Sequence, residues 1–169
     1  MTLDSVLQVV EVTLRTSPVG AWMRHSVWAW PVLESLHFIG MSVLIGTIGL
    51  FDLRLLGFAR GIPYAAMHRL IPIGIGAYVL NMVTGFCFLS GTPDQYLWNI
   101  AFRSKVTFMA IAGLNVLFFY SRVFRRLQQL PPDSAPPFGA RVAGAVSLTM
   151  WIGVMSAGRL LTFFRPPYV

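Results

Sequence analysis

Residues 30–56 read WPVLESLHFIGMSVLIGTIGLFDLRLL, a long run in which apolar residues predominate. About 20 such residues are enough for an α-helix to cross the hydrocarbon core of a bilayer. Trp30 suits an interfacial aromatic belt, and Pro31 suits the first turn of a helix. After Glu34, charge returns only near the end, at Asp52 and Arg54. The stretch therefore predicts a transmembrane helix over 30–56.

Three further apolar stretches of similar length follow, and they predict transmembrane helices over 70–89, 100–120 and 141–164. Apolar residues before the first span recur at helical spacing, which predicts a short amphipathic helix over 1–20 on the membrane surface. The expected fold class is all-α. We expect a single membrane domain over 1–169, built as a polytopic, antiparallel bundle of four transmembrane helices with this surface helix at its N-terminus.

The composition supports a membrane protein and excludes several other classes. Hydrophobic residues make up 56% of the chain and charged residues 11%, whereas soluble domains carry about a quarter charged residues. The 13 basic residues outnumber the 6 acidic ones, but they lie at the ends of the apolar stretches, so we expect no nucleic-acid partner. The expected partner is the lipid bilayer, with a homo-oligomer or a larger membrane complex as further possibilities. Soluble catalytic motifs such as GxSxG, HExxH and the P-loop do not occur.

The distribution of the basic residues predicts the orientation of the bundle. Seven lie at one membrane face, namely Arg54, Arg60, Arg69, Arg122, Arg125, Arg126 and Arg141. Six lie at the other, namely Arg15, Arg24, Arg103, Lys105, Arg159 and Arg165. Cytoplasmic loops carry the excess of Lys and Arg, so the first face, including the loop 127–139, should be cytoplasmic. Both termini should then lie outside the cytoplasm.

Each predicted span contains a polar group about 10 Å from the same membrane face, given a rise of 1.5 Å per residue. These groups are Glu34 and His37, Asn81, Lys105, and Arg159. Ionisable groups in hydrocarbon are costly, so they usually face the interior of a bundle and mark a site. We therefore expect these residues to converge in one polar site, with Glu34 paired to at least one cation.

The residues of this site suit haem b. A neutral histidine is a common ligand of haem iron, and His37 is the candidate metal ligand, with Met109 or Met155 one turn deeper in the position opposite. Lys105 and Arg159 could meet the propionates. His68 is expected at the opposite face, where it cannot share a haem with His37. Two alternatives stay open: a structural ion-pair cluster, and a site for a lipid phosphate or a carboxylate metabolite.

Two short motifs carry a resemblance to a known family. The first is Leu36-His37, followed by small residues and by the segment 49–55, and the second is Trp98 with Lys105 and Asn115. They resemble the small bacterial membrane protoporphyrinogen oxidase, and the copper-resistance D-type membrane domains look similar too. In the oxidase family the histidine of the first helix binds haem b, and an arginine and a lysine are functional. By position these would be His37, Arg54 and Lys105.

The resemblance covers about residues 30–125. The family has a second histidine where this chain has Asn115, so the resemblance implies the haem site rather than the oxidase reaction. The chain is also similar to bacterial four-helix membrane families with a histidine-led first helix, which implies the bacterial inner membrane. The predicted function is haem b binding in the outer half of the bundle, for electron transfer or porphyrin-related chemistry. The alternatives are binding or transport of an anionic lipid or small metabolite, and an accessory subunit of a larger membrane complex.

Overall fold

The computed structural model describes residues 3–131 and 134–164, and all regular structure within them is helical. The elements are α1 (Leu3–Thr16), α2 (Pro18–His25), α3 (Ala29–Leu56), α4 (Tyr64–His68), α5 (Ile71–Gly91), α6 (Pro93–Leu97), α7 (Ile100–Phe118), the π-helical turn η1 (Phe119–Val123), α8 (Phe124–Gln128) and α9 (Phe138–Leu160). Four helical stretches are long and apolar enough to cross a membrane, namely Ala29–Leu56, Tyr64–Gly91, Ile100–Gln128 and Phe138–Leu160. The prediction of an all-α protein with four such helices is confirmed.

Several predicted boundaries differ from those observed. The expected helix over 1–20 is two helices, because the Ser17 side chain accepts a hydrogen bond from the Gly20 amide and Pro18 occupies the first turn of α2. The third stretch continues beyond Tyr120 to Gln128, since no glycine or proline interrupts it before Pro131. The fourth begins at Phe138 and ends at Leu160. Arg165, counted above among the basic residues, lies outside the described residues.

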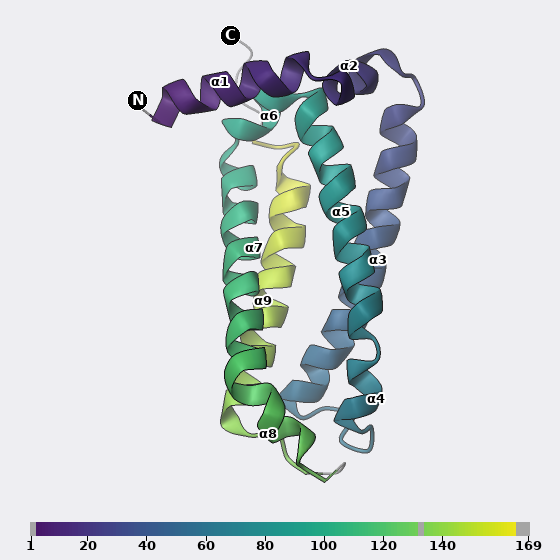
Figure 1. Cartoon of the computed structure of the whole chain (residues 1–169), viewed down its shortest axis with the longest axis vertical. Helices are drawn as coiled ribbons and strands as arrows, with labels where there is room; N and C mark the ends of the chain where they lie inside the picture. Colours follow the sequence, from purple (N-terminus) through teal and green to yellow (C-terminus); the bar gives the residue numbers. More distant parts are fainter. Residues whose placement is uncertain (1–2, 132–133, 165–169) are drawn as a thin grey trace.

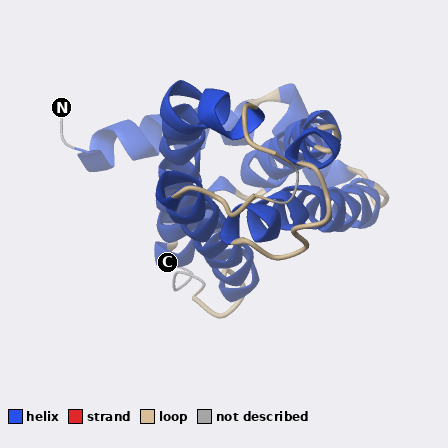
Figure 2. Ribbon diagram, turned by 90° about the horizontal axis from the view of Figure 1, so that it is seen from below, coloured by secondary structure: helices blue, strands red, loops and turns tan. Residues whose placement is uncertain are grey.

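The four long helices form two closely packed pairs, α3 with α5 and α7 with α9 (Figure 1). Contacts between α3 and α9 join the two pairs, whereas α5 and α7 do not pack closely against each other. Viewed along the bundle, the helices surround a central region (Figure 2). We call the end of the bundle that carries α1, α2 and α6 the α6 end, and the end that carries α4 and α8 the α8 end (Figure 1).

Buried side chains gather at the two ends of the bundle. The larger cluster lies at the α8 end and includes Phe51, Leu55, Tyr64, Phe119 and Leu127. The smaller cluster, at the α6 end, contains Met23, Ala29 and Phe88. Between these clusters, the interior of the bundle contains cavities that residues of the four long helices line.

Close contacts between helices occur at small residues, as they do in many membrane proteins. A Cβ added to Gly144 of α9 would lie 2.9 Å from the backbone oxygen of Asp52, and one added to Gly74 of α5 would lie 2.8 Å from Ile48. The sequence suggests this role also for Ser42 and Gly46. That expectation is wrong, because both are exposed and a Cβ on Gly46 would meet no atom within 4 Å.

Candidate functional site

Two cavities lie between the helix pairs, and residues of α3, α5, α7 and α9 line both. The α6-end cavity has a volume of about 200 Å³, and the α8-end cavity has a volume of about 400 Å³. They share four lining residues, namely Leu44, Tyr78, Met109 and Trp151. The rings of Tyr78 and Trp151 meet edge to face with centroids 6.0 Å apart. This layer of side chains separates the two cavities.

Five of the seven predicted site residues line the α6-end cavity, namely His37, Asn81, Lys105, Met109 and Met155. They come from all four long helices, so the fold brings together polar groups that lie far apart in the chain. The predicted convergence is wrong for Glu34 and Arg159. Neither lines the cavity, and the side chains of both are exposed.

The outward placement of Glu34 and Arg159 follows from their positions near helix ends. Glu34 lies in the second turn of α3, and no hydrogen bond or ion pair joins its carboxylate to a residue that the structure describes. Arg159 lies in the last turn of α9, with its guanidinium carbon 5.8 Å from the centre of the Phe163 ring. Polar side chains near a helix end can reach the membrane interface, so they avoid the cost of burial in the bundle.

His37 is oriented by a hydrogen bond to the neighbouring helix. Its Nδ1 atom lies 2.6 Å from the hydroxyl oxygen of Thr84, and that hydroxyl donates its own hydrogen to the Leu80 carbonyl at 2.8 Å. With the hydroxyl hydrogen on the Leu80 carbonyl, Thr84 accepts from Nδ1–H and Nε2 keeps a free lone pair; in the other tautomer the hydroxyl donates to Nδ1 and Nε2 carries the hydrogen. Nε2 makes no hydrogen bond with any described residue. The ring has space beside Gly85, where a Cβ would lie 3.9 Å from its Cε1 atom.

Lys105 extends from α7 across to α9. Its ammonium nitrogen lies 3.8 Å from the position that a Cβ would take on Gly158. No carboxylate lines the α6-end cavity, and no ion pair joins Lys105 to a residue that the structure describes. An ammonium group without a counter-charge inside a membrane bundle is costly. The cavity is therefore suited to an anionic group.

Asn81 contributes a polar group that lacks partners. Its side-chain nitrogen and oxygen are both buried, and neither has a hydrogen-bond partner among the residues that the structure describes. The amide lies over α3 at Gly40, where a Cβ would come within 3.0 Å of it. A glycine at this position lets the amide approach the backbone of α3 closely. Buried amides are normally paired, so this one favours a ligand that can accept or donate a hydrogen bond.

His68 lies at the membrane face that the sequence predicts, and Asn115 makes a contact between two helices. His68 is at the α8 end, with its Nε2 atom 3.0 Å from the Tyr120 hydroxyl, and it does not line the α6-end cavity. Asn115, at the position of the family's second histidine, donates a hydrogen bond of 2.9 Å to the Ala143 carbonyl. Its amide therefore links α7 to α9.

Sequence reasoning missed Thr84 and Asp52. Asp52 is only 3% exposed and lines the α8-end cavity, although the sequence places it merely in the charged end of the first span. A signal was present: Asp52 follows His37 by 15 residues, with Met41, Leu44 and Ile48 on the same helical face between them. This alignment along one helical face is the sequence signal for the inward position of the Asp52 carboxylate.

Comparison with protein families, curated proteins and solved structures finds no match for this chain. Among the residues that the structure describes, no three His, Cys, Asp or Glu side chains lie together in a group that could hold a metal ion. The candidate ligands His37, Met109 and Met155 would not form such a group, because methionine is not one of these four residue types. The two cavities are therefore the features of this chain that point to a function.

Proposed function

We propose that this protein is an integral membrane protein that binds haem b at the α6-end cavity through His37. The observation that carries the proposal is the hydrogen bond between His37 Nδ1 and the Thr84 hydroxyl, which orients the ring and leaves Nε2 without a partner among the described residues. Histidines that ligate metals usually donate their other ring N–H to a fixed acceptor, which sets the tautomer and the orientation of the ring. Haem b supplies one-electron redox chemistry when it is bound.

The other residues of the cavity fit the same ligand. Met109 and Met155 offer thioether sulfurs, which serve as haem ligands opposite histidine in some cytochromes. Lys105 supplies a positive charge for a propionate, and the Asn81 amide lacks partners that a bound group could provide. The walls are otherwise apolar. Glu34 and Arg159, which the sequence also suggests for this site, do not take part in the proposal.

The access route follows from the helix arrangement. A cavity of about 200 Å³ is smaller than the roughly 300–1,000 Å³ typical of ligand pockets, so a larger ligand needs additional space. Met82 of α5 and Val106 of α7 line this cavity and are exposed, so the cavity reaches the lipid-facing surface between these two helices. An amphipathic ligand could enter from the bilayer by this route and extend into it.

The test is the absorbance spectrum of the protein purified in detergent from haem-replete cells. Wild type should show a Soret band, and His37→Ala should lose it. His68→Ala should retain it, because that histidine lies at the α8 end. His25→Ala, which removes an exposed histidine of α2, serves as the second control. A colourless wild-type protein would overturn the proposal, and an unchanged band in His37→Ala would exclude His37 as the ligand.

A second candidate is the binding or transport of an anionic lipid or small metabolite. The observation in its favour is the unpaired ammonium of Lys105 in a cavity with apolar walls. Native mass spectrometry of the colourless protein would then detect a co-purified anionic amphiphile. Lys105→Ala should lose this ligand, whereas Arg103→Ala, which removes an exposed charge two residues earlier, should retain it. An accessory role in a larger membrane complex has no particular observation in its favour.

The placement in the membrane is part of the same proposal. We place α3, α5, α7 and α9 as an antiparallel bundle in a bacterial inner membrane, with α1 lying on the surface of the bilayer. The apolar spans and their short connections support this placement. The excess of arginine at the α8 end supports a cytoplasmic location for that end, with both termini outside the cytoplasm.

A further inference from the structure

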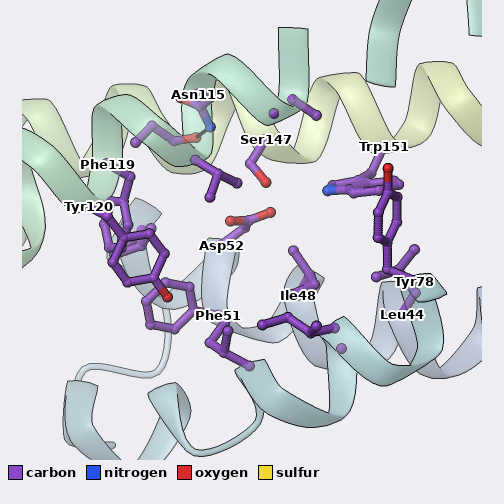
Figure 3. Close-up of a pocket in the computed structure, with 18 of the residues that line it drawn as sticks. Leu44, Ile48, Phe51, Asp52, Tyr78, Asn115, Phe119, Tyr120, Ser147 and Trp151 are labelled. Carbon is purple, nitrogen blue, oxygen red and sulfur yellow. Dashed lines mark hydrogen bonds between the residues drawn. The ribbon is translucent and has the colours of Figure 1, made fainter. Parts of the chain in front are cut away.

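Asp52 is a buried carboxylate that has no role in the proposed haem site. Its side chain projects into the α8-end cavity, and Ser147 points towards it (Figure 3). The Oδ2 atom is buried and has no hydrogen-bond partner within residues 3–131 and 134–164. A carboxylate inside a membrane bundle is expensive unless it is paired, and such residues usually mark a site. The structure therefore contains an acidic group that is suited to a positively charged partner.

Aromatic rings surround this carboxylate. Those that line the cavity belong to Phe51, Tyr78, Phe119, Tyr120 and Trp151. In Figure 3, Tyr78 and Trp151 lie on one side of Asp52, with Phe119 and Tyr120 on the other. No Lys, Arg or His side chain is found among the described residues that line the cavity. Ring faces attract organic cations, most strongly where water is excluded.

We propose that the α8-end cavity binds a lipophilic monovalent organic cation, with Asp52 as its counter-charge and the aromatic rings as its walls. The volume of about 400 Å³ lies within the range of ligand pockets. A hard inorganic cation such as Ca²⁺ needs six or more oxygen ligands, and this mostly apolar cavity does not provide them. A quaternary ammonium or phosphonium group needs only one counter-charge and polarisable walls.

The same helix gap gives access to this second cavity. Ile75 of α5 and Val116 of α7 line it, and both side chains are about half exposed. Their exposure means that the cavity reaches the surface between these two helices. The adjoining wall contains the π-helical turn η1, which begins at Phe119 and includes Tyr120. π-helical turns are frequent at functional sites, and here the turn contributes two rings to the wall.

Binding of radiolabelled tetraphenylphosphonium to the detergent-purified protein tests the proposal. Wild type should bind the probe saturably, and unlabelled probe should displace it while neutral triphenylphosphine oxide should not. Asp52→Asn should weaken binding by roughly tenfold or more, because the buried counter-charge is lost. Asp52→Glu should bind the probe better than Asp52→Asn. Asp94→Asn, which alters an acidic residue of α6, is the matched control and should bind like wild type.

Trp151→Leu provides a second variant that leaves the carboxylate in place, and it should also weaken binding because a wall ring is lost. Melting temperatures of all variants identify any that fail to fold. Equal binding by wild type and a folded Asp52→Asn would overturn the proposal, and so would displacement by the neutral analogue. The haem spectrum is a separate readout. His37→Ala should bind tetraphenylphosphonium normally, so the two proposals can fail independently.

Discussion

Thr84 determines which nitrogen of His37 is free. Its hydroxyl oxygen lies 2.6 Å from Nδ1 and 2.8 Å from the Leu80 carbonyl, so it holds the ring against α5 and leaves Nε2 without a partner among the described residues. For ligand binding, the hydrogen bond that orients the ring therefore matters more than the mere presence of a histidine. A lone histidine in an apolar helix says little about ligand binding, whereas one whose ring is oriented by a buried hydroxyl is better prepared to act as a ligand.

Thr84→Val keeps the shape of the side chain and removes the hydroxyl. We expect haem affinity to fall roughly ten- to a hundredfold, because the outer partner that orients the ligand is lost. Titration of the apoprotein with haem, followed at the Soret band, measures this. Thr107→Val is the control, since the Thr107 hydroxyl bonds only within α7. Equal affinity in the two variants would show that Thr84 does not orient the ring.

The exposed side chain of Glu34 shows that spacing within one helix does not by itself determine burial. The sequence suggests a buried counter-charge, but the side chain is exposed. Its spacing from His37 favours a shared helical face, yet a position near the helix start also allows the side chain to reach the interface. Burial of both groups would have required α7 or α9 to cover the start of α3. The packing of those helices cannot be read from the spacing within one helix.

At the scale of the elements, small residues decide which helices approach one another. Gly144 of α9 lies against the backbone of α3 beside Asp52, and a Cβ there would also lie 2.9 Å from the Cβ of Leu55. Contacts to backbone atoms cannot be relieved by a change of rotamer. The contact of α9 with α3 joins the two helix pairs, so it also keeps the walls of both cavities together.

Gly144→Ala should lower the free energy of unfolding by about 1–3 kcal/mol, because α3 and α9 are forced apart. Gly46→Ala is a matched control, since its Cβ would enter open space and alanine favours a helix by about 1 kcal/mol over glycine. The midpoint of thermal unfolding in detergent, followed by circular dichroism, compares the two. A Gly144→Ala protein as stable as Gly46→Ala would contradict the importance of this contact.

At the scale of the whole molecule, charge distinguishes the two ends of the bundle. Six exposed arginines belong to the α8 end, namely Arg60, Arg69, Arg122, Arg125, Arg126 and Arg141. Arg54, which the sequence counts with them, is fully buried and donates hydrogen bonds to the Ile62 carbonyl and the Tyr64 hydroxyl. It holds the connection between α3 and α4, so the exposed arginines alone favour the cytoplasmic placement of this end.

Cysteine labelling in intact cells tests the orientation. In a Cys87→Ala background, Ala135→Cys places an exposed thiol at the α8 end and Val27→Cys places one at the α6 end. A membrane-impermeant maleimide should label the second variant and not the first. Permeabilised cells provide the control, because both thiols should then react. Labelling only at position 135 in intact cells would reverse the orientation, and with it the leaflet in which the α6-end cavity lies.

The number and approximate limits of the apolar helices could be predicted from the sequence alone, because hydropathy is a sum over about 20 neighbouring residues. Polar groups within those helices could be found in the same way, and three of them, His37, Asn81 and Lys105, do share one cavity. The tertiary structure alone decided that Glu34 and Arg159 face outward, that Thr84 orients His37, and that Asp52 lies in a second cavity. These features depend on contacts between helices that are distant in the chain. A small rotation of one helix would bury side chains that are now exposed and expose others that are now buried.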